Sequence, residues 1–170
     1  VNCKNYRTVK KNKTKNKQQT KKITKKNKFK KYRATGPNDY SPVTVVISFV
    51  ADPCYHYKNL SEANRKVRAT GNLYLCDSTL EEGWYRFVEP AGSKMPTTRV
   101  PNGRCNTDWS GWLVGAHPTV EDGEVEKMVC FSDRSTGCKY GKEISVKNCG
   151  SYFIYKLYPP SCTSRYCSTD

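Results

Sequence analysis

The cysteines of this chain are the feature that most limits what it can fold into. Eight of the nine lie between Cys54 and Cys167, and only Cys3 stands outside that segment. Thiols in the cytosol are kept reduced, so this density is typical of proteins built for an oxidising compartment. The segment also lacks the C-x-x-C pairs that structural zinc sites commonly use. The pattern therefore predicts a disulfide-stapled domain that is secreted or lies on the extracellular side of the membrane, while the pairing of its cysteines stays open.

Charge divides the chain in the opposite way. Residues 1–33 contain 15 Lys or Arg and no acid, whereas the whole chain has 30 basic and 15 acidic residues, so the remainder is formally neutral. A run of like charges opposes helix formation and compaction, which predicts a disordered, low-complexity basic tail over residues 1–36. The tail lacks the interleaved aromatic residues of single-strand binders, so a solvated segment is favoured and no nucleic-acid partner is expected. The alternative is contact with a polyanion of the heparan type through its clustered lysines: Lys10, Lys11, Lys21, Lys22, Lys25, Lys26, Lys30 and Lys31.

Residues 37–51 are predicted to be a linker. Within it, Val43–Val50 is rich in β-branched residues and indicates an edge strand, or else the remnant of a signal peptide. The apolar run from Val43 to Ala51 has nine residues, far fewer than the roughly 20 that cross a bilayer. No transmembrane segment is therefore expected here.

Residues 52–167 are predicted to form the disulfide-rich domain, a small, mainly β module with irregular loops. In its last strand, Phe153, Tyr155 and Leu157 are expected to face the core, with Ile154 among the residues of the outer face. Ser61–Arg68 is compatible with a short helix capped by its first residue. Short apolar segments punctuated by Gly and Pro predict strands at Trp84–Val88, Trp112–Val114, Val125–Phe131, Glu143–Val146 and Tyr152–Leu157.

The sequence predicts no catalytic, cofactor or metal site. It contains no G-x-S-x-G or comparable nucleophile signature, so we interpret the chain as a non-enzyme. His117 precedes Pro118 in a turn, where its imidazole is expected to pack or to cap a backbone group. The pairs Glu81-Glu82 and Glu121-Asp122 lie in polar loops and are interpreted as solvated turn residues, without the ligand spacing of an EF-hand.

Two sequons for N-linked glycosylation occur, at Asn12 and Asn59. Asn59-Leu60-Ser61 is the better candidate because it lies in a polar stretch of the cysteine domain that is expected to be exposed. Asn12-Lys13-Thr14 falls in the basic tail.

The order of landmarks from about Asp52 to Cys167 resembles the uromodulin-type eight-cysteine domain of extracellular glycoproteins. These landmarks together are far more specific than a count of cysteines. They are Asp52-Pro53-Cys54, Gly83-Trp84-Tyr85-Arg86-Phe87, Lys94-Met95, Arg104-Cys105-Asn106-Thr107, Trp112-Leu113, Gly115, His117-Pro118, Gly123, Cys130, Cys138, Cys149, Tyr152–Leu157, Pro160, Cys162 and Tyr166-Cys167.

The resemblance implies a pairing of the eight cysteines and also shows departures. Ten-cysteine relatives carry two further cysteines where this chain has Arg99 and Gly137, and their joint absence is expected if they pair. Two sequons known in relatives align with 114–116 and 156–158 of this chain, where no asparagine stands. The implied bridges are Cys54 to Cys149, Cys76 to Cys162, Cys105 to Cys167 and the local Cys130 to Cys138.

The function that the resemblance implies is that of a non-catalytic extracellular module in a larger secreted or membrane-anchored glycoprotein. It would act as a structural spacer or a protein-interaction domain, with other extracellular domains or glycoproteins as partners. The alternative is adhesion or carbohydrate binding through aromatic side chains, although such rings more often belong to the core. The rings considered for it are Tyr55, Tyr57, Trp109 and Tyr158.

Overall fold

The computed structural model describes residues 51–71, 74–135 and 137–170. The predicted basic tail and most of the predicted linker lie outside the described residues. Mainly β structure is confirmed for the domain, which has almost no helix. No helix in the described ranges combines the length and apolarity that crossing a bilayer requires. Its elements are η2 (Pro53–Tyr55), β1 (Lys58–Leu60), η3 (Ala63–Arg65), β2 (Gly83–Phe87), β3 (Trp109–Leu113), β4 (Glu124–Ser132), β5 (Tyr140–Asn148), β6 (Phe153–Leu157) and β7 (Ser164–Tyr166), where η marks a 3-10 turn.

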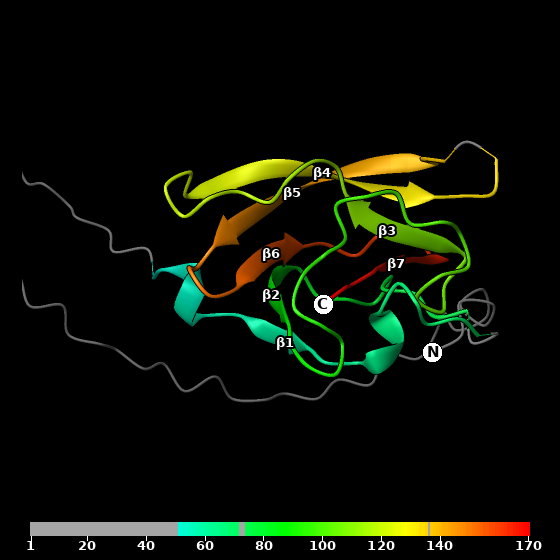
Figure 1. The fold of residues 1–170 in the computed structure, drawn as a ribbon, viewed down its shortest axis with the longest axis horizontal. Helices are drawn as coiled ribbons and strands as arrows, with labels where there is room; N and C mark the ends of the chain where they lie inside the picture. The colour runs from blue at the N-terminus through cyan, green and yellow to red at the C-terminus, as the bar shows by residue number, and fades with distance from the viewer. Residues whose placement is uncertain (1–50, 72–73, 136) are drawn as a thin grey trace, which may run out of the picture. The chain divides into compact units, whose positions relative to one another are not determined.

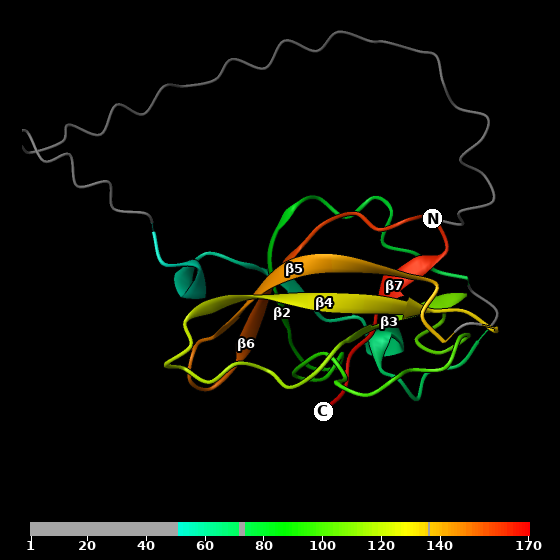
Figure 2. The same cartoon turned by 90° about the horizontal axis from the view of Figure 1, so that it is seen from above.

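The strands form one seven-stranded sheet in the order β1-β2-β6-β5-β4-β3-β7 (Figure 1). The central neighbours run antiparallel, whereas each edge strand lies parallel to its neighbour, β1 beside β2 and β7 beside β3. The two longest strands, β4 and β5, lie side by side across the domain (Figure 2). The first and the last strand in sequence are therefore the two opposite edges of the sheet.

The hydrophobic core lies against one face of this sheet. Tyr155 and Leu157 of β6 are fully buried, in agreement with the predicted alternation, and Phe153 is half-buried. The prediction for Ile154 is wrong, because its side chain is also fully buried, so β6 is covered on both faces at this residue. The other buried core residues are Leu60, Tyr85, Phe87, Ala91, Met95, Leu113, Val129, Phe131, Ile144, Val146 and Tyr166.

The helix considered for Ser61–Arg68 does not form. Only the 3-10 turn η3 is present, and the residue before it, Glu62, makes no capping hydrogen bond through its side chain. The reason lies in the partners of the following residues. Lys66 pairs with Ser168 in a parallel β-bridge, and the Val67 N–H donates to the Ser168 carbonyl at 2.9 Å. Contact with the end of the chain thus holds this segment extended, against its local preference for a helix.

Candidate functional site

The described residues offer no obvious reaction centre. Among them, no three His, Cys, Asp or Glu side chains gather where they could hold a metal ion. The features that stand out are two clamps, one at each end of the domain. We call the first the N-terminal clamp (Asp52, Cys54, Lys147, Cys149 and Tyr152) and the second the C-terminal clamp (Arg65, Asp77, Cys105, Arg165 and Cys167).

The N-terminal clamp fastens the start of the domain to the turn between β5 and β6. Asp52 begins the turn η2, and its Oδ1 accepts hydrogen bonds from the Cys54 N–H and the Lys147 ammonium, both at 2.9 Å. These two donors hold the pKa of Asp52 below its ordinary value. Cys54 is bonded to Cys149, 95 residues away, and its carbonyl accepts from the Tyr152 hydroxyl at 2.7 Å. A covalent bond and three polar contacts therefore meet at one point.

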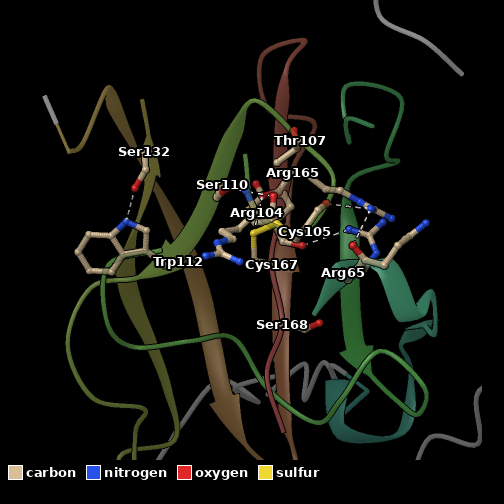
Figure 3. Close-up of a disulfide and its surroundings, with 12 residues drawn as sticks. Arg65, Arg104, Cys105, Thr107, Ser110, Trp112, Ser132, Arg165, Cys167 and Ser168 are labelled. Atoms are coloured by element: carbon tan, nitrogen blue, oxygen red, sulfur yellow. Dashed lines mark hydrogen bonds between the residues drawn. A yellow bond between two sulfur atoms is a disulfide. The ribbon is translucent and has the colours of Figure 1, made fainter. Parts of the chain in front are cut away.

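The disulfide of the C-terminal clamp joins the end of β7 to the loop before β3 (Figure 3). Cys105 and Cys167 are both fully buried, and the Cys167 N–H donates to the Gly111 carbonyl at 3.1 Å. Gly111 is required here, because a Cβ at this position would lie 2.8 Å from the Arg165 carbonyl oxygen and from the Phe131 ring. The close approach of β3 and β7 therefore depends on a missing side chain.

Beside this disulfide lies a buried cluster of three charged side chains, each 3 to 4% exposed. Asp77 accepts two hydrogen bonds from the Arg65 guanidinium, at 2.8 and 2.9 Å, and a third from the Tyr166 N–H of β7 at 2.9 Å. The second guanidinium, that of Arg165, has its Nε 3.9 Å from Asp77. It donates to the carbonyls of Asn64 and Cys105. One carboxylate thus holds the last strand against a loop nearly 90 residues away in sequence.

The two arginines of this cluster titrate differently. Burial alone would lower the pKa of Arg65, but the carboxylates of Asp77 and Glu62 outweigh it and raise that pKa. Burial and the neighbouring Arg65 charge lower the pKa of Arg165 to about 10. Both guanidinium groups remain charged near neutral pH. The sequence predicts none of these roles, because an isolated Arg or Asp gives no sign of burial when its partners are distant in the chain.

The last residues of the chain continue the C-terminal clamp. Thr169 pairs with Lys94 in an antiparallel bridge, and a Cβ on Gly92 would lie 2.5 Å from the Thr169 carbonyl oxygen. The Lys66 ammonium forms ion pairs with both Asp170 and Glu89. The segment after β7 is therefore held between the loop at Lys66 and the loop at Lys94.

The other two predicted bridges join Cys130 to Cys138 and Cys76 to Cys162. Cys130 and Cys138 are bonded near the tip of the β4–β5 hairpin, the local bridge that the resemblance implies. The sulfur atoms of Cys76 and Cys162 lie 3.8 Å apart, and neither of these cysteines is free. The structure thus brings these two cysteines together, and their bond stays a prediction.

His117 packs inside the domain in the turn after β3. Its ring lies over Phe153 with the ring centroids 4.3 Å apart, and its Nε2 is 2.8 Å from the Tyr155 hydroxyl. That hydroxyl also accepts from the Met95 N–H at 3.0 Å, and it can donate its own proton to Nε2 when the neutral imidazole carries its proton on Nδ1. Burial and the nearby ammonium groups of Lys94 and Lys127 lower the pKa of His117 to about 4. The histidine is therefore a packing group that holds the turn on the core.

Only one of the four aromatic side chains considered for adhesion is fully presented to solvent. The side chain of Tyr55 is 81% exposed, whereas Tyr57 is half-buried and contacts the ring of Tyr152. Trp109 packs edge-on against Tyr140, and Tyr158 packs against the hydrophobic core. Of these four side chains, Tyr55 alone therefore protrudes into solvent.

The glycosylation candidates fall on different parts of the chain. Asn59 is exposed and lies in the middle of the edge strand β1. Asn12, the eight clustered lysines and Cys3 lie outside the described residues. The structure therefore places only Asn59 on the surface of the folded domain.

Comparison with known proteins adds the family context. Residues 85–168 match the model of the uromodulin-like domain family. The pancreatic secretory granule membrane major glycoprotein GP2 of Canis lupus familiaris is 40% identical over 119 residues, 69% of this chain and 23% of that protein. Uromodulin of Mus musculus is 41% identical over 119 residues, 69% of this chain and 18% of that protein. The chain thus spans about a fifth of the length of these curated relatives.

Proposed function

Because the cysteine-rich domain of this chain belongs to the uromodulin-like domain family, we propose that it serves a larger extracellular glycoprotein as a non-catalytic module. The domain is extracellular, in keeping with its disulfides and with its glycoprotein relatives. Its role in the proposal is that of a spacer, which keeps neighbouring parts of the glycoprotein at a fixed separation. Neighbouring domains or glycoproteins are its partners.

The observation that carries the proposal is the position of the two clamps. The first and last strands are opposite edges of the sheet, and each end of the domain is joined covalently to its interior, at Cys54 and at Cys167. A force that pulls the two ends of the domain apart therefore acts on the disulfides at Cys54 and Cys167 and does not only separate an edge strand from the sheet. This arrangement suits a module that transmits tension without lengthening.

The proposal is tested by stretching single molecules of the full chain between peptide tags at its two ends. With Cys54 bonded to Cys149, the path from Cys54 to Cys167 contains only the roughly 18 residues after Cys149, which extend to about 60 Å. Reduction frees the 95 residues closed by that bridge, so the extended chain should gain about 330 Å.

The Cys130→Ala/Cys138→Ala variant is the matched control, because its bridge lies inside the loop that the first disulfide closes. Its oxidised length should equal that of the unchanged chain. A spacer role is contradicted if the oxidised protein lengthens as far as the reduced protein under the same force.

Adhesion through aromatic side chains has less support. Tyr57, Trp109 and Tyr158 are engaged with neighbouring side chains, which leaves Tyr55 as the only one of the four that is fully presented. A single ring gives too little buried area for a specific interface of ordinary size.

A further inference from the structure

The edge strand β1 contains Asn59, the asparagine of a glycosylation sequon. Asn59 is exposed and lies beside Arg86 of β2 in the parallel register. Strand β1 has one neighbour in the sheet, so its other edge is not covered by a strand of the described domain. Exposed edges of this kind invite pairing with other chains, and proteins commonly protect them.

Next to Asn59 lies a group of three side chains that we call the tyrosine–arginine platform (Tyr57, Arg86 and Tyr152). The guanidinium carbon of Arg86 lies 3.9 Å from the centroid of the Tyr152 ring, and its Nη1 donates to the Tyr57 hydroxyl at 3.1 Å. The two tyrosine rings are 5.6 Å apart, edge to face. Since the Tyr152 hydroxyl also bonds the Cys54 carbonyl, the platform is anchored to the N-terminal clamp.

The spacing between Asn59 and this platform fits a sugar that folds back onto the protein. Tyr57 precedes Asn59 by two residues, and in extended chain residues i and i+2 project from the same face. Arg86 links the two positions, because it is the register partner of Asn59 and contacts the Tyr57 ring and hydroxyl. A sugar attached to Asn59 therefore starts within reach of a half-exposed aromatic ring.

We propose that Asn59 carries an N-linked glycan whose first N-acetylglucosamine lies on the Tyr57 ring and shields the open edge of β1. In the modifying step the Asn59 amide nitrogen forms a bond to C1 of the sugar. The bond from C1 to a lipid-linked diphosphate breaks, and that diphosphate leaves with the electron pair while the amide nitrogen loses one proton. The donor is a lipid-diphosphate oligosaccharide of the secretory pathway, which an extracellular protein meets on its way out. The site stands independently of the spacer role.

Occupancy and packing are tested on the full chain secreted from eukaryotic cells. Peptide mass spectrometry should find a glycan on Asn59. Trimming the glycan to one N-acetylglucosamine should leave the midpoint of thermal unfolding unchanged, whereas removing that last sugar should lower it by about 3 °C. In NMR spectra, the acetyl methyl signal of the remaining sugar should be shifted upfield by the Tyr57 ring.

Two variants separate a specific contact from a general effect of glycans. Ser61→Ala removes the Asn59 sequon at an exposed position and should reproduce the loss of thermal stability, while Thr14→Ala, which removes the Asn12 sequon, should not. Tyr57→Leu lowers stability by itself. The quantity to compare in that variant is therefore the difference in thermal midpoint between the protein with the last sugar and the protein without it, and this difference should vanish. An unmodified Asn59, or a sugar effect of equal size in the Tyr57→Leu chain, would overturn the proposal.

Discussion

The buried carboxylate of Asp77 should be the most sensitive single position in the domain that is not a cysteine. Its side chain is 4% exposed and accepts two hydrogen bonds from Arg65 and one from the Tyr166 N–H. Replacing Asp77 by Ala leaves the buried guanidinium groups of Arg65 and Arg165 facing each other without the negative charge between them. Breaking a buried pair in this way costs about 3–5 kcal/mol, against a total stability on the order of 10 kcal/mol.

The assay is urea unfolding of the oxidised chain, followed by tyrosine and tryptophan fluorescence. With a slope of about 1.5 kcal/mol per molar urea, the Asp77→Ala midpoint should fall by about 2–3 M. Asp77→Asn keeps the size and one acceptor oxygen, so its midpoint should lie between those of Asp77→Ala and the unchanged chain. Added salt should alter these differences little, because buried charges are poorly screened.

The matched control is Glu81→Gln, which removes a carboxylate charge that pairs with Lys58 on the surface. Both side chains of that pair are more than half exposed, so its loss should leave the midpoint unchanged within error. A loss of less than about 1 kcal/mol in Asp77→Ala would refute the reasoning. It would mean that the disulfide of the C-terminal clamp and the pairing with β3 position β7 without this carboxylate.

Three further predictions concern other parts of the chain. The pKa of His117 is about 4 in the folded chain, below its ordinary 6.5, so as the pH falls this histidine is protonated in the unfolded chain before it is protonated in the folded chain. The free energy of unfolding should therefore be greatest above about pH 6.5 and fall by about 1 kcal/mol toward pH 4, a figure reduced to account for the partial exposure of the ring. His117→Gln should remove that slope in urea midpoints, and equal slopes in both chains would contradict it. Non-reducing peptide mapping should recover Cys76 joined to Cys162, and recovery of either one joined to Cys3 would disprove this pairing. Deleting residues 1–33 should abolish retention on a heparin column at moderate salt; unchanged elution would end the polyanion hypothesis.

The sequence predicts the centre of the sheet better than its edges. Strands β2, β4, β5 and β6 each carry apolar residues at strand spacing, and the predicted segments overlap all four. The edge strands β1 and β7 have three residues each, too few to display an alternation. Both pair in parallel with segments distant in sequence, so only the tertiary fold reveals them.

The sequence could not predict the C-terminal clamp, for a related reason. The cysteine content predicts that bridges exist, and the resemblance implies which ones, but neither shows that Asp77 lies between two buried arginines. In the sequence Arg65 belongs to a polar segment that is compatible with a short helix. Its burial depends on partners 12 and 101 residues away. Long-range pairing thus overrode the local preference.

Arg99 and Gly137 stand where the resemblance places a fifth bridge of ten-cysteine relatives. The resemblance places two additional cysteines of ten-cysteine relatives at Arg99 and Gly137, and the structure makes these positions neighbours. A Cβ at Gly137 would lie 3.1 Å from the guanidinium carbon of Arg99, so the larger side chain occupies the space that the smaller one leaves. Gly137 also has a φ of +76°, which disfavours any side chain there. The two residues are therefore complementary in size, and a cysteine placed at Gly137 alone would be crowded against Arg99 and would have no partner cysteine at that site.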